Sequence, residues 1–402
     1  MKTKKRDWHI ILLIITLIFS LGFRIEHRYF YRNLYLDTEV QMAAAQNWLN
    51  GDGFITHEVD STGWSQTTTR SAHIFMPGYA FALAGLKLLF NDWFRANFVL
   101  DVMGLIFIYL ALYLFFWKLT GSHFSKSYFL YLLWQAFSPA PMHYLTGSGL
   151  WALGILLCGM AAIYLESDKA RKNMLSYVGI LLIVCTAWIR DAYMLFGLIP
   201  VIWFALQYAR NRNKTNLFPL IFSVFLFGLS QVLIHGWWHA EASYLPRQAY
   251  GFFPGQLLFM DPFPFKTFFY YGIFHEQSLK MWSESTWIGL KIIADMISIT
   301  VIGIVLKSGW EVIRRKPDDH PQARSFIFFA FITGLINVGF IAASSLFIPA
   351  DDWNWIGFWT FVMETRYFLP VMMVMLIWVF YVVFDEGMRK MKFSHTFLKL
   401  LV

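Results

Sequence analysis

One stretch near the N-terminus decides the fold of this 402-residue chain. Residues 8–54 read WHIILLIITLIFSLGFRIEHRYFYRNLYLDTEVQMAAAQNWLNGDGF. An apolar run over 8–23 leads through a polar connection to Asp37 and Glu39, which open a shorter amphipathic pattern. The apolar run approaches the ~20 residues with which an α-helix crosses a bilayer. The stretch therefore predicts a membrane-spanning helix followed by an interfacial helix that carries two carboxylates.

The composition extends this interpretation to the whole chain. Hydrophobic residues make up 57% and charged residues only 14%, which is more apolar than a water-soluble surface accommodates. We therefore predict an all-α, polytopic membrane protein with a single integral-membrane domain over 1–402 and about ten spans of roughly 20 residues. The spans are expected over 8–23, 97–117, 127–143, 149–165, 175–189, 193–208, 216–236, 287–306, 325–346 and 367–384.

Basic residues indicate the orientation of these spans. Clusters of lysines and arginines lie before the first span and in every second connection after it, and this pattern places these clusters on the inner side. The net charge of +8 is thus mostly a topological signal, and no basic patch interleaved with aromatics supports binding to nucleic acid. We expect a bacterial-type cytoplasmic (inner) membrane, with both termini in the cytoplasm and the functional site on the periplasmic face.

The expected organisation follows from this orientation. It comprises a first helix over 1–23, an outer loop with interfacial helices over 24–96, spans over 97–236, a second outer loop over 237–286, and three further spans with a cytoplasmic tail over 287–402.

The first outer loop carries two predicted helices. Apolar residues recur at helical spacing after Asp37, and Asn50 to Gly53 end the pattern. A second apolar segment begins at Pro77, the residue type favoured in the first turn of a helix. Both helices are too short to span and are suited to the plane of the interface.

Three segments of the chain together form a recognisable pattern. They are Asp37 with Ala45, Leu49 and Gly51, followed by the Pro-Gly-Tyr segment at 77–79; Trp188 to Asp191 at the end of the fifth span; and Glu364 to Pro370 at the entry to the last span. This pattern resembles the GT-C superfamily of integral-membrane glycosyltransferases, and within it the protein O-mannosyltransferase and lipid A aminoarabinose transferase branch. The resemblance implies inverting transfer of a sugar from a polyprenyl-phosphate donor to a lipid, glycan or protein acceptor.

The resemblance also implies roles for the residues of the first loop. Asp37 matches the leading aspartate of the family by its spacing to Ala45 and Leu49, and it is the expected general base; capping of its own helix is the simpler alternative. Glu39 is expected to support the acceptor or a metal ion, or to favour the positive helix N-terminus. His73, ahead of Pro77, is a further supporting candidate.

The leaving lipid phosphate needs cationic stabilisation as charge accumulates on its oxygens. Arg190, Arg247 and Arg366 are the candidates, and Tyr367 could donate a hydrogen bond to the same phosphate. The simpler interpretation pairs Arg190 with Asp191 or lets it snorkel to the interface, and it treats Arg366 and Tyr367 as membrane anchors.

Two other features bear on the chemistry. His235 and His239 share a helical face, with Glu241 nearby, which suggests a metal site. The zinc motif HExxH is absent, so we prefer an interfacial histidine pair to a metal site. A divalent metal ion stays open as a cofactor. Asp101, near the outer end of the second span, is expected to face the outer cavity.

Two rival functions remain from the sequence. A polyprenyl-linked polysaccharide ligase or polymerase would use a similar donor, although such enzymes concentrate their functional residues in a later loop. A secondary transporter would place binding groups on broken helices near the middle of the membrane. The polar residues of this chain gather in the outer loops instead.

Overall fold

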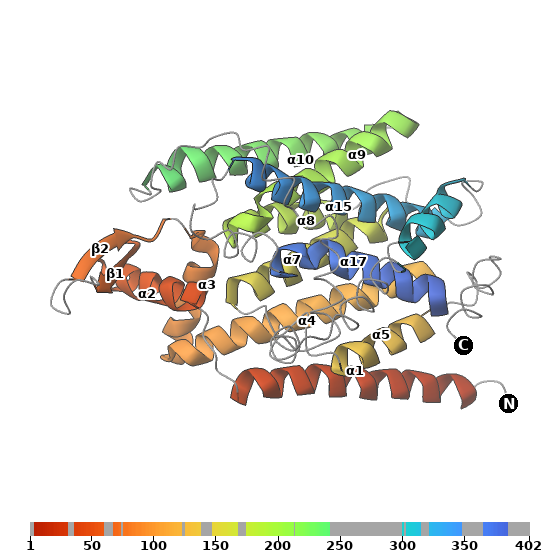
Figure 1. The fold of residues 1–402 in the computed structure, drawn as a ribbon, viewed down its shortest axis with the longest axis horizontal. Helices are drawn as coiled ribbons and strands as arrows, with labels where there is room; N and C mark the ends of the chain where they lie inside the picture. The colour runs from red at the N-terminus through yellow and green to blue at the C-terminus, as the bar shows by residue number, and fades with distance from the viewer. Residues whose placement is uncertain are drawn as a thin grey trace, which may run out of the picture.

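The computed structural model of this protein consists mostly of α-helices, with a small two-stranded sheet near the N-terminus (Figure 1). It describes residues 4–30, 36–59, 67–73, 75–122, 125–137, 147–167, 174–212, 214–241, 300, 303–314, 321–347 and 365–384.

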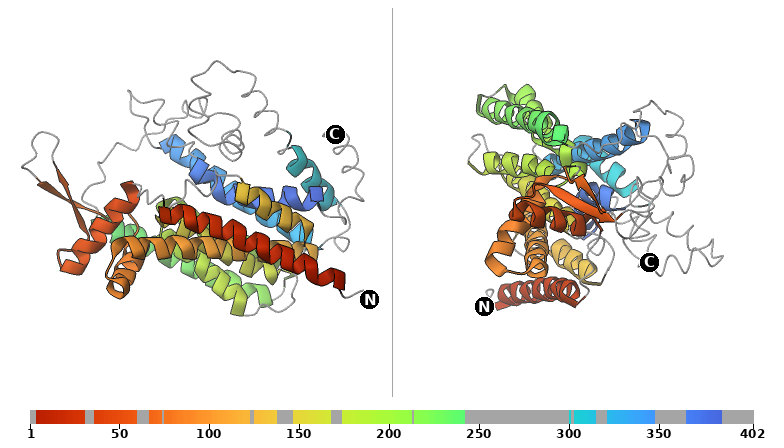
Figure 2. Two further views of the ribbon diagram at one scale, coloured as in Figure 1. Left: turned by 90° about the horizontal axis from the view of Figure 1, so that it is seen from below. Right: turned by 90° about the vertical axis from the view of Figure 1, so that its left-hand side faces the viewer.

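The longer helices run roughly along one direction and form a bundle, as the two views of Figure 2 also show. They are α1 (Lys4–Phe30), α4 (Trp93–Thr120), α5 (Lys126–Phe137), α7 (Gly147–Leu165), α8 (Met174–Cys185), α9 (Leu198–Asn211), α10 (Lys214–Leu233), α15 (Pro321–Phe347) and α17 (Thr365–Phe384). A further helical segment covers 303–314. Short 3₁₀ helices η1 (Thr186–Trp188) and η2 (Asp191–Gly197) join α8 to α9, and a π-helical turn η3 (Ile234–Trp238) and η4 (His239–Glu241) follow α10.

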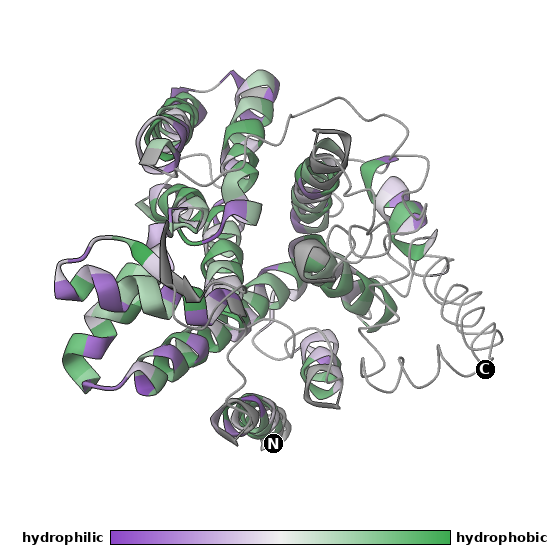
Figure 3. Ribbon diagram, turned by 60° about the vertical axis from the view of Figure 1, so that its left-hand side comes forward, coloured by the Kyte–Doolittle hydropathy of each residue, from purple (hydrophilic) through white to green (hydrophobic). Residues whose placement is uncertain are grey.

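Within these described ranges, five helical stretches are long and apolar enough to cross a membrane. They are Trp93–Thr120, Gly147–Leu165, Asp191–Arg210, Lys214–Trp238 and Pro321–Phe340. Hydrophobic residues run along the helices of the bundle (Figure 3). The predicted class of helical membrane protein is therefore supported, whereas the predicted count of about ten spans is not confirmed.

Close approach of main chains holds the centre of the bundle together. A Cβ on Gly154 of α7 would lie 2.6 Å from the carbonyl oxygen of Gly104 on α4, and a Cβ on Gly179 of α8 would lie 2.7 Å from that of Gly159 on α7. Small residues at such crossings let membrane helices pack backbone to backbone. The α4, α7 and α8 helices therefore form a tightly packed centre.

The first predicted loop folds into a lobe at the end of the bundle opposite to the N-terminus (Figure 1). We call this region the N-terminal lobe; its parts are α2 (Leu36–Asn50), β1 (Ile55–Val59), β2 (Thr67–Ser71) and α3 (Pro77–Phe90). Both helices were predicted, and α2 ends at the predicted Asn50.

The antiparallel hairpin of the N-terminal lobe is an addition to the predicted all-α class. Ile55 pairs with Ser71 and Val59 pairs with Thr67. The β-branched residues of both strands favour extended backbone. The sequence between them has no two-residue turn motif of the kind that predicts a hairpin.

Candidate functional site

Side chains hold the N-terminal lobe to the bundle. Asn47 of α2 donates through Nδ2 to the carbonyl oxygen of Ile55 at 2.8 Å, which joins α2 to the hairpin. Trp93 of α4 donates through Nε1 to Oε1 of Gln46 at 2.7 Å, which joins α2 to the bundle. The carboxylates of α2 are therefore carried by an anchored helix.

Asp37 and Glu39 both lie in the first turn of α2, which begins at Leu36. Asp37 is half-buried and Glu39 is exposed, since residues two positions apart on a helix face different directions. Carboxylates in a first turn interact favourably with the helix dipole, so the simpler electrostatic role applies to both. Their environments nevertheless separate them, because only Asp37 is partly withdrawn from solvent.

The buried side of this first turn contacts α7. Thr38 and Gln41 are each 2% exposed. Gln41 donates through Nε2 to the carbonyl oxygen of Asp37 at 3.0 Å and approaches Oγ of Ser148 on α7 at 3.4 Å. The main chain at Asp37 is thereby fixed relative to the start of α7.

The start of α3 is the second organising element of the site. We call Phe75–Tyr79 the α3 entry segment. The carbonyl oxygen of Phe75 accepts a hydrogen bond from Nε1 of Trp238 at 3.0 Å, and Tyr79 donates through its hydroxyl group to Oδ1 of Asn97 on α4. A Cβ on Gly78 would lie 2.6 Å from the carbonyl oxygen of Trp188. The segment therefore touches η3, α4 and η1.

Arg190 lies close to this segment. It stands between η1 and η2 in extended backbone (φ −153°, ψ 130°), two residues after Trp188, and is half-buried. On the other side of the segment, Tyr79 lies beside Gly147, which itself lies against Thr38 of α2. The α3 entry segment thus brings the Arg190 turn and the Asp37 turn to the same end of the bundle.

Asp191 follows Arg190 and opens η2. Its Oδ1 atom is buried and has no hydrogen-bond partner in the described part of the protein, and the same holds for the hydroxyl group of Tyr193. Charge on Arg190 acts electrostatically on both side chains. The electrostatic interaction agrees with the simpler interpretation, in which Arg190 and Asp191 neutralise one another. That interpretation leaves Oδ1 of Asp191 without a hydrogen bond in the described part of the protein.

His73 lies in an aromatic cluster between the hairpin and η3. Its Nδ1 is 2.7 Å from Oγ of Ser71, and its ring centroid is 4.3 Å from that of Trp238 and 5.5 Å from that of Phe54. The cluster gives His73 a packing role, and its predicted role toward the acceptor stays a prediction.

The predicted histidine pair continues this cluster. The rings of His235 and His239 have centroids 5.5 Å apart. Burial lowers the pKa of His239 below its ordinary value, and the nearby charges of His235 and His73 act in the same direction. Among the described residues, no three His, Cys, Asp or Glu side chains are grouped so that they could hold a metal ion. The suggested divalent ion therefore stays a prediction.

The side chains of the remaining candidates lie outside the described part of the protein. Arg247 belongs to the second outer loop, which is not described beyond residue 241. Arg366 and Tyr367 are placed only as backbone, in the first turn of α17. Their proposed contacts with phosphate are consequently untested.

Two buried polar residues lie close to the first turn of α2, and the sequence analysis singled out Asp101 but not Ser148. Ser148 is 5% exposed and Asp101 is 4% exposed. Asp101 was expected to face the outer cavity; one of its carboxylate oxygens instead accepts a hydrogen bond from the main-chain N–H of Gly147 at 2.8 Å. A polar residue inside an apolar run is the signal that points to such positions, but it does not name the partner.

No known protein-family model matches this chain, and no curated protein matches it either.

Proposed function

We propose that the protein is an inverting, GT-C-like glycosyltransferase that takes its sugar from a polyprenyl-phosphate donor. The observation that carries the proposal is the arrangement around the α3 entry segment, with a half-buried carboxylate at Asp37 on one side and the Arg190 turn on the other. Transfer from a lipid phosphate needs a proton acceptor and a stabilised phosphate, and these two side chains supply the matching chemistry.

In the proposed reaction Asp37 accepts the proton of the acceptor hydroxyl or amine. The freed electron pair attacks the anomeric carbon, and the bond from that carbon to the phosphate oxygen breaks. The phosphate leaves with the bonding electron pair, and Arg190 stabilises its added charge through charge-assisted hydrogen bonds. Arg247, Arg366 and Tyr367 are proposed to complete the phosphate site, and Glu39 to support the acceptor.

The basic ends of the helices support an outer location for this site. α4 starts beside the N-terminal lobe and is 28 residues long, so its C-terminus with Lys118 lies roughly 42 Å away. α10 continues into η3, whose Trp238 contacts the lobe, so the start of α10, with Arg212 just before it, lies at the far end as well. Because basic residues favour the cytoplasmic side, we propose that the lobe faces the periplasm across the inner membrane.

The test is transfer of labelled sugar from polyprenyl-phosphate donors by the protein in liposomes, with Asp37→Asn as the critical variant. Transfer by Asp37→Asn should be at least about a hundredfold slower than transfer by the wild-type protein, because the base is lost. Asp52→Asn is the matched control, since it removes an exposed carboxylate just beyond the end of α2. Full activity of Asp37→Asn would disprove the assigned base, and a stepwise lengthening product would favour the ligase or polymerase alternative.

One observation favours the transporter alternative. The helical stretch from α8 to α9 is broken at η1 and η2, and the break carries Arg190 and the unsatisfied Asp191 oxygen. Broken helices with ionisable residues are typical of transporter binding sites. Uptake of a free sugar phosphate into the same liposomes, with no sugar transferred, would replace the enzyme proposal with this alternative.

A further inference from the structure

Asp101 is a buried carboxylate in the candidate span of α4. It is 4% exposed, and its Oδ1 accepts the main-chain N–H of Gly147 at 2.8 Å. An ionisable side chain at such a position is costly unless it has a functional or structural partner. Its partner here is the first residue of α7.

Gly147 is shaped for contact with the N-terminal lobe. Its φ of +55° lies in the left-handed region, where glycine is favoured. A Cβ at this position would lie 2.5 Å from Oγ1 of Thr38 and 3.2 Å from the hydroxyl oxygen of Tyr79. The start of α7, to which Asp101 is hydrogen-bonded, therefore packs against the first turn of α2.

The next residue of α7 makes a second connection to the same turn. Ser148 Oγ lies 3.4 Å from Nε2 of Gln41, and that Nε2 also donates to the carbonyl oxygen of Asp37 at 3.0 Å. Thr38, Gln41 and Ser148 are each at most 5% exposed. Since solvent is excluded from these side chains, water cannot readily replace a lost contact.

From this chain of contacts we propose that Asp101 is a positioning residue for Asp37, acting through Gly147 and Ser148 on the first turn of α2. The proposal rests on the proposed function, in which Asp37 is the base. A general base must come within about 2.6–3.2 Å of the proton it removes, and a misplacement of about 1 Å can cost roughly a hundredfold in rate. When the hydrogen bond from Gly147 to Asp101 is lost, the start of α7 can move, and the first turn of α2 with Asp37 moves with it.

A purely structural role would make Asp101 one more link between α4 and α7. These two helices are also held by the close contact of Gly154 with Gly104, which lies two turns further along α7 and does not involve α2. Gly154→Ala therefore loosens the same helix pair without touching the lobe. It is the matched control for any general loss of packing.

The experiment compares Asp101→Leu, Asp101→Asn and Gly154→Ala by transfer kinetics, hydrogen exchange and thermal unfolding. In Asp101→Leu, kcat should fall by about tenfold or more with the KM for the donor nearly unchanged, and the main-chain amides of residues 38–41 should exchange faster. Asp101→Asn keeps an Oδ1 acceptor for Gly147 and should restore both properties. Gly154→Ala should lower the unfolding temperature and leave exchange in α2 unchanged.

Equal loss of kcat in Asp101→Leu and Gly154→Ala at equal thermal destabilisation would overturn the positioning role, as would unchanged exchange in α2. If Asp101→Leu does not fold, Gln41→Met tests the same chain from the α2 side, because it keeps the size of the side chain and removes both hydrogen bonds. Wild-type activity and unchanged exchange at residue 38 in that variant would overturn the proposal. Failure of the proposed function shows separately, as full transfer by Asp37→Asn, while hydrogen exchange still decides whether Asp101 controls the α2 turn.

Discussion

Gly78 lies so close to Trp188 that a Cβ on the glycine would stand 2.6 Å from the tryptophan carbonyl oxygen and 3.1 Å from its carbonyl carbon. A main-chain carbonyl cannot turn aside as a flexible side chain can. This contact fixes the distance between the start of α3 and the turn that carries Arg190. The rest of the candidate site is arranged around it.

We expect Gly78→Ala to destabilise the protein by about 1–3 kcal/mol, because the added methyl group forces the two main chains apart. Thermal unfolding in detergent measures the effect. Gly85→Ala is the matched control in the same helix, since nothing lies within 4 Å of a Cβ there, and it should be neutral or stabilise by up to about 1 kcal/mol. Equal unfolding temperatures for the two variants would show that the contact with Trp188 is not tight.

Arg190→Ala should weaken binding of a polyprenyl phosphate by about tenfold to a hundredfold, which corresponds to a charge-assisted hydrogen bond of roughly 1.5–3 kcal/mol. Arg190→Lys should recover only part of the affinity, because lysine keeps the charge and loses the planar fork. Arg95→Ala serves as the control, since its side chain is 74% exposed. Unchanged affinity of Arg190→Ala in a vesicle-binding assay would remove Arg190 from the phosphate site.

Trp238→Phe should destabilise the junction between η3 and the α3 entry segment by about 1–3 kcal/mol. The variant keeps an aromatic ring among Phe54 and His73 but leaves the carbonyl oxygen of Phe75 without its donor. Trp237→Phe is the neighbouring control, because Trp237 is 57% exposed. A drop in unfolding temperature that is the same for both variants would contradict the role of the hydrogen bond.

Acidification should destabilise the protein through His239. Burial and the charges of His235 and His73 lower the pKa of His239 in the folded state below its ordinary 6.5, so the unfolded chain binds the proton more readily. Stability is therefore fully present above about pH 6.5 and is lost as the pH falls toward and below the folded-state pKa. Between about pH 7.5 and pH 5.5 the unfolding temperature of His239→Gln should fall less than that of the wild type. Parallel curves would exclude His239 as the titrating group.

Much of the helical framework could be predicted from the sequence because apolar runs and helix-ending residues are local signals. The pattern after Asp37 predicted α2, and Asn50 to Gly53 predicted its end correctly. The hairpin was not predicted, because its strands are short and polar and are separated by a long connection. Local sequence patterns predict single helices, whereas the pairing of two short strands depends on their packing against residues elsewhere in the chain.

The candidate site was less accessible to sequence reasoning. Asp37 and Arg190 were singled out one at a time. The link between them runs through two close contacts, that of Gly78 with the main chain of Trp188 and that of Gly147 with the side chains of Thr38 and Tyr79. A bond from Asp101 to a backbone N–H leaves no periodic pattern and no charged partner in the sequence. Such contacts are set by helix packing, which fixes the mutual positions of residues far apart in the chain.

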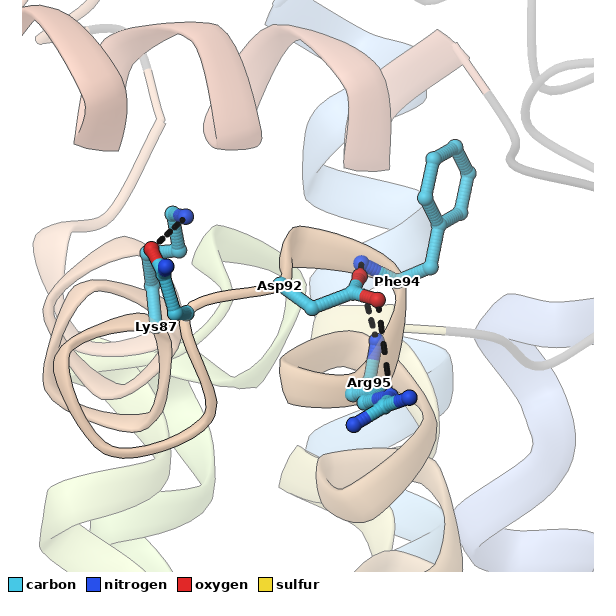
Figure 4. A network of polar contacts seen from close by, with 5 residues as sticks. Lys87, Asp92, Phe94 and Arg95 are labelled. Atoms are coloured by element: carbon cyan, nitrogen blue, oxygen red, sulfur yellow. Dashed lines mark hydrogen bonds and ion pairs between the residues drawn. The ribbon is translucent and has the colours of Figure 1, made fainter.

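The corner between α3 and α4 carries an exposed pair of leucines. Leu88 and Leu89 are 73% and 76% exposed at the end of α3, and burying such a side chain is worth about 1.5–3 kcal/mol. Polar contacts surround them: Lys87 Nζ donates to Oδ1 of Asn91 at 2.9 Å, and the Asp92 carboxylate accepts the main-chain N–H groups of Phe94 and Arg95 (Figure 4). An apolar pair beside charged side chains is typical of a helix end that dips into the lipid headgroup region.

A fluorophore attached to Leu88→Cys or Leu89→Cys should therefore be quenched by lipids brominated near the headgroup. The same fluorophore on Asn50→Cys is the control, because Asn50 is exposed at the C-terminal end of α2, where no comparable pair of exposed leucines lies beside it in the described residues. We expect quenching at α3 and little at Asn50, since apolar surface is withdrawn from water by the bilayer. Equal quenching at both positions would show that α3 is not the part of the lobe that meets the membrane.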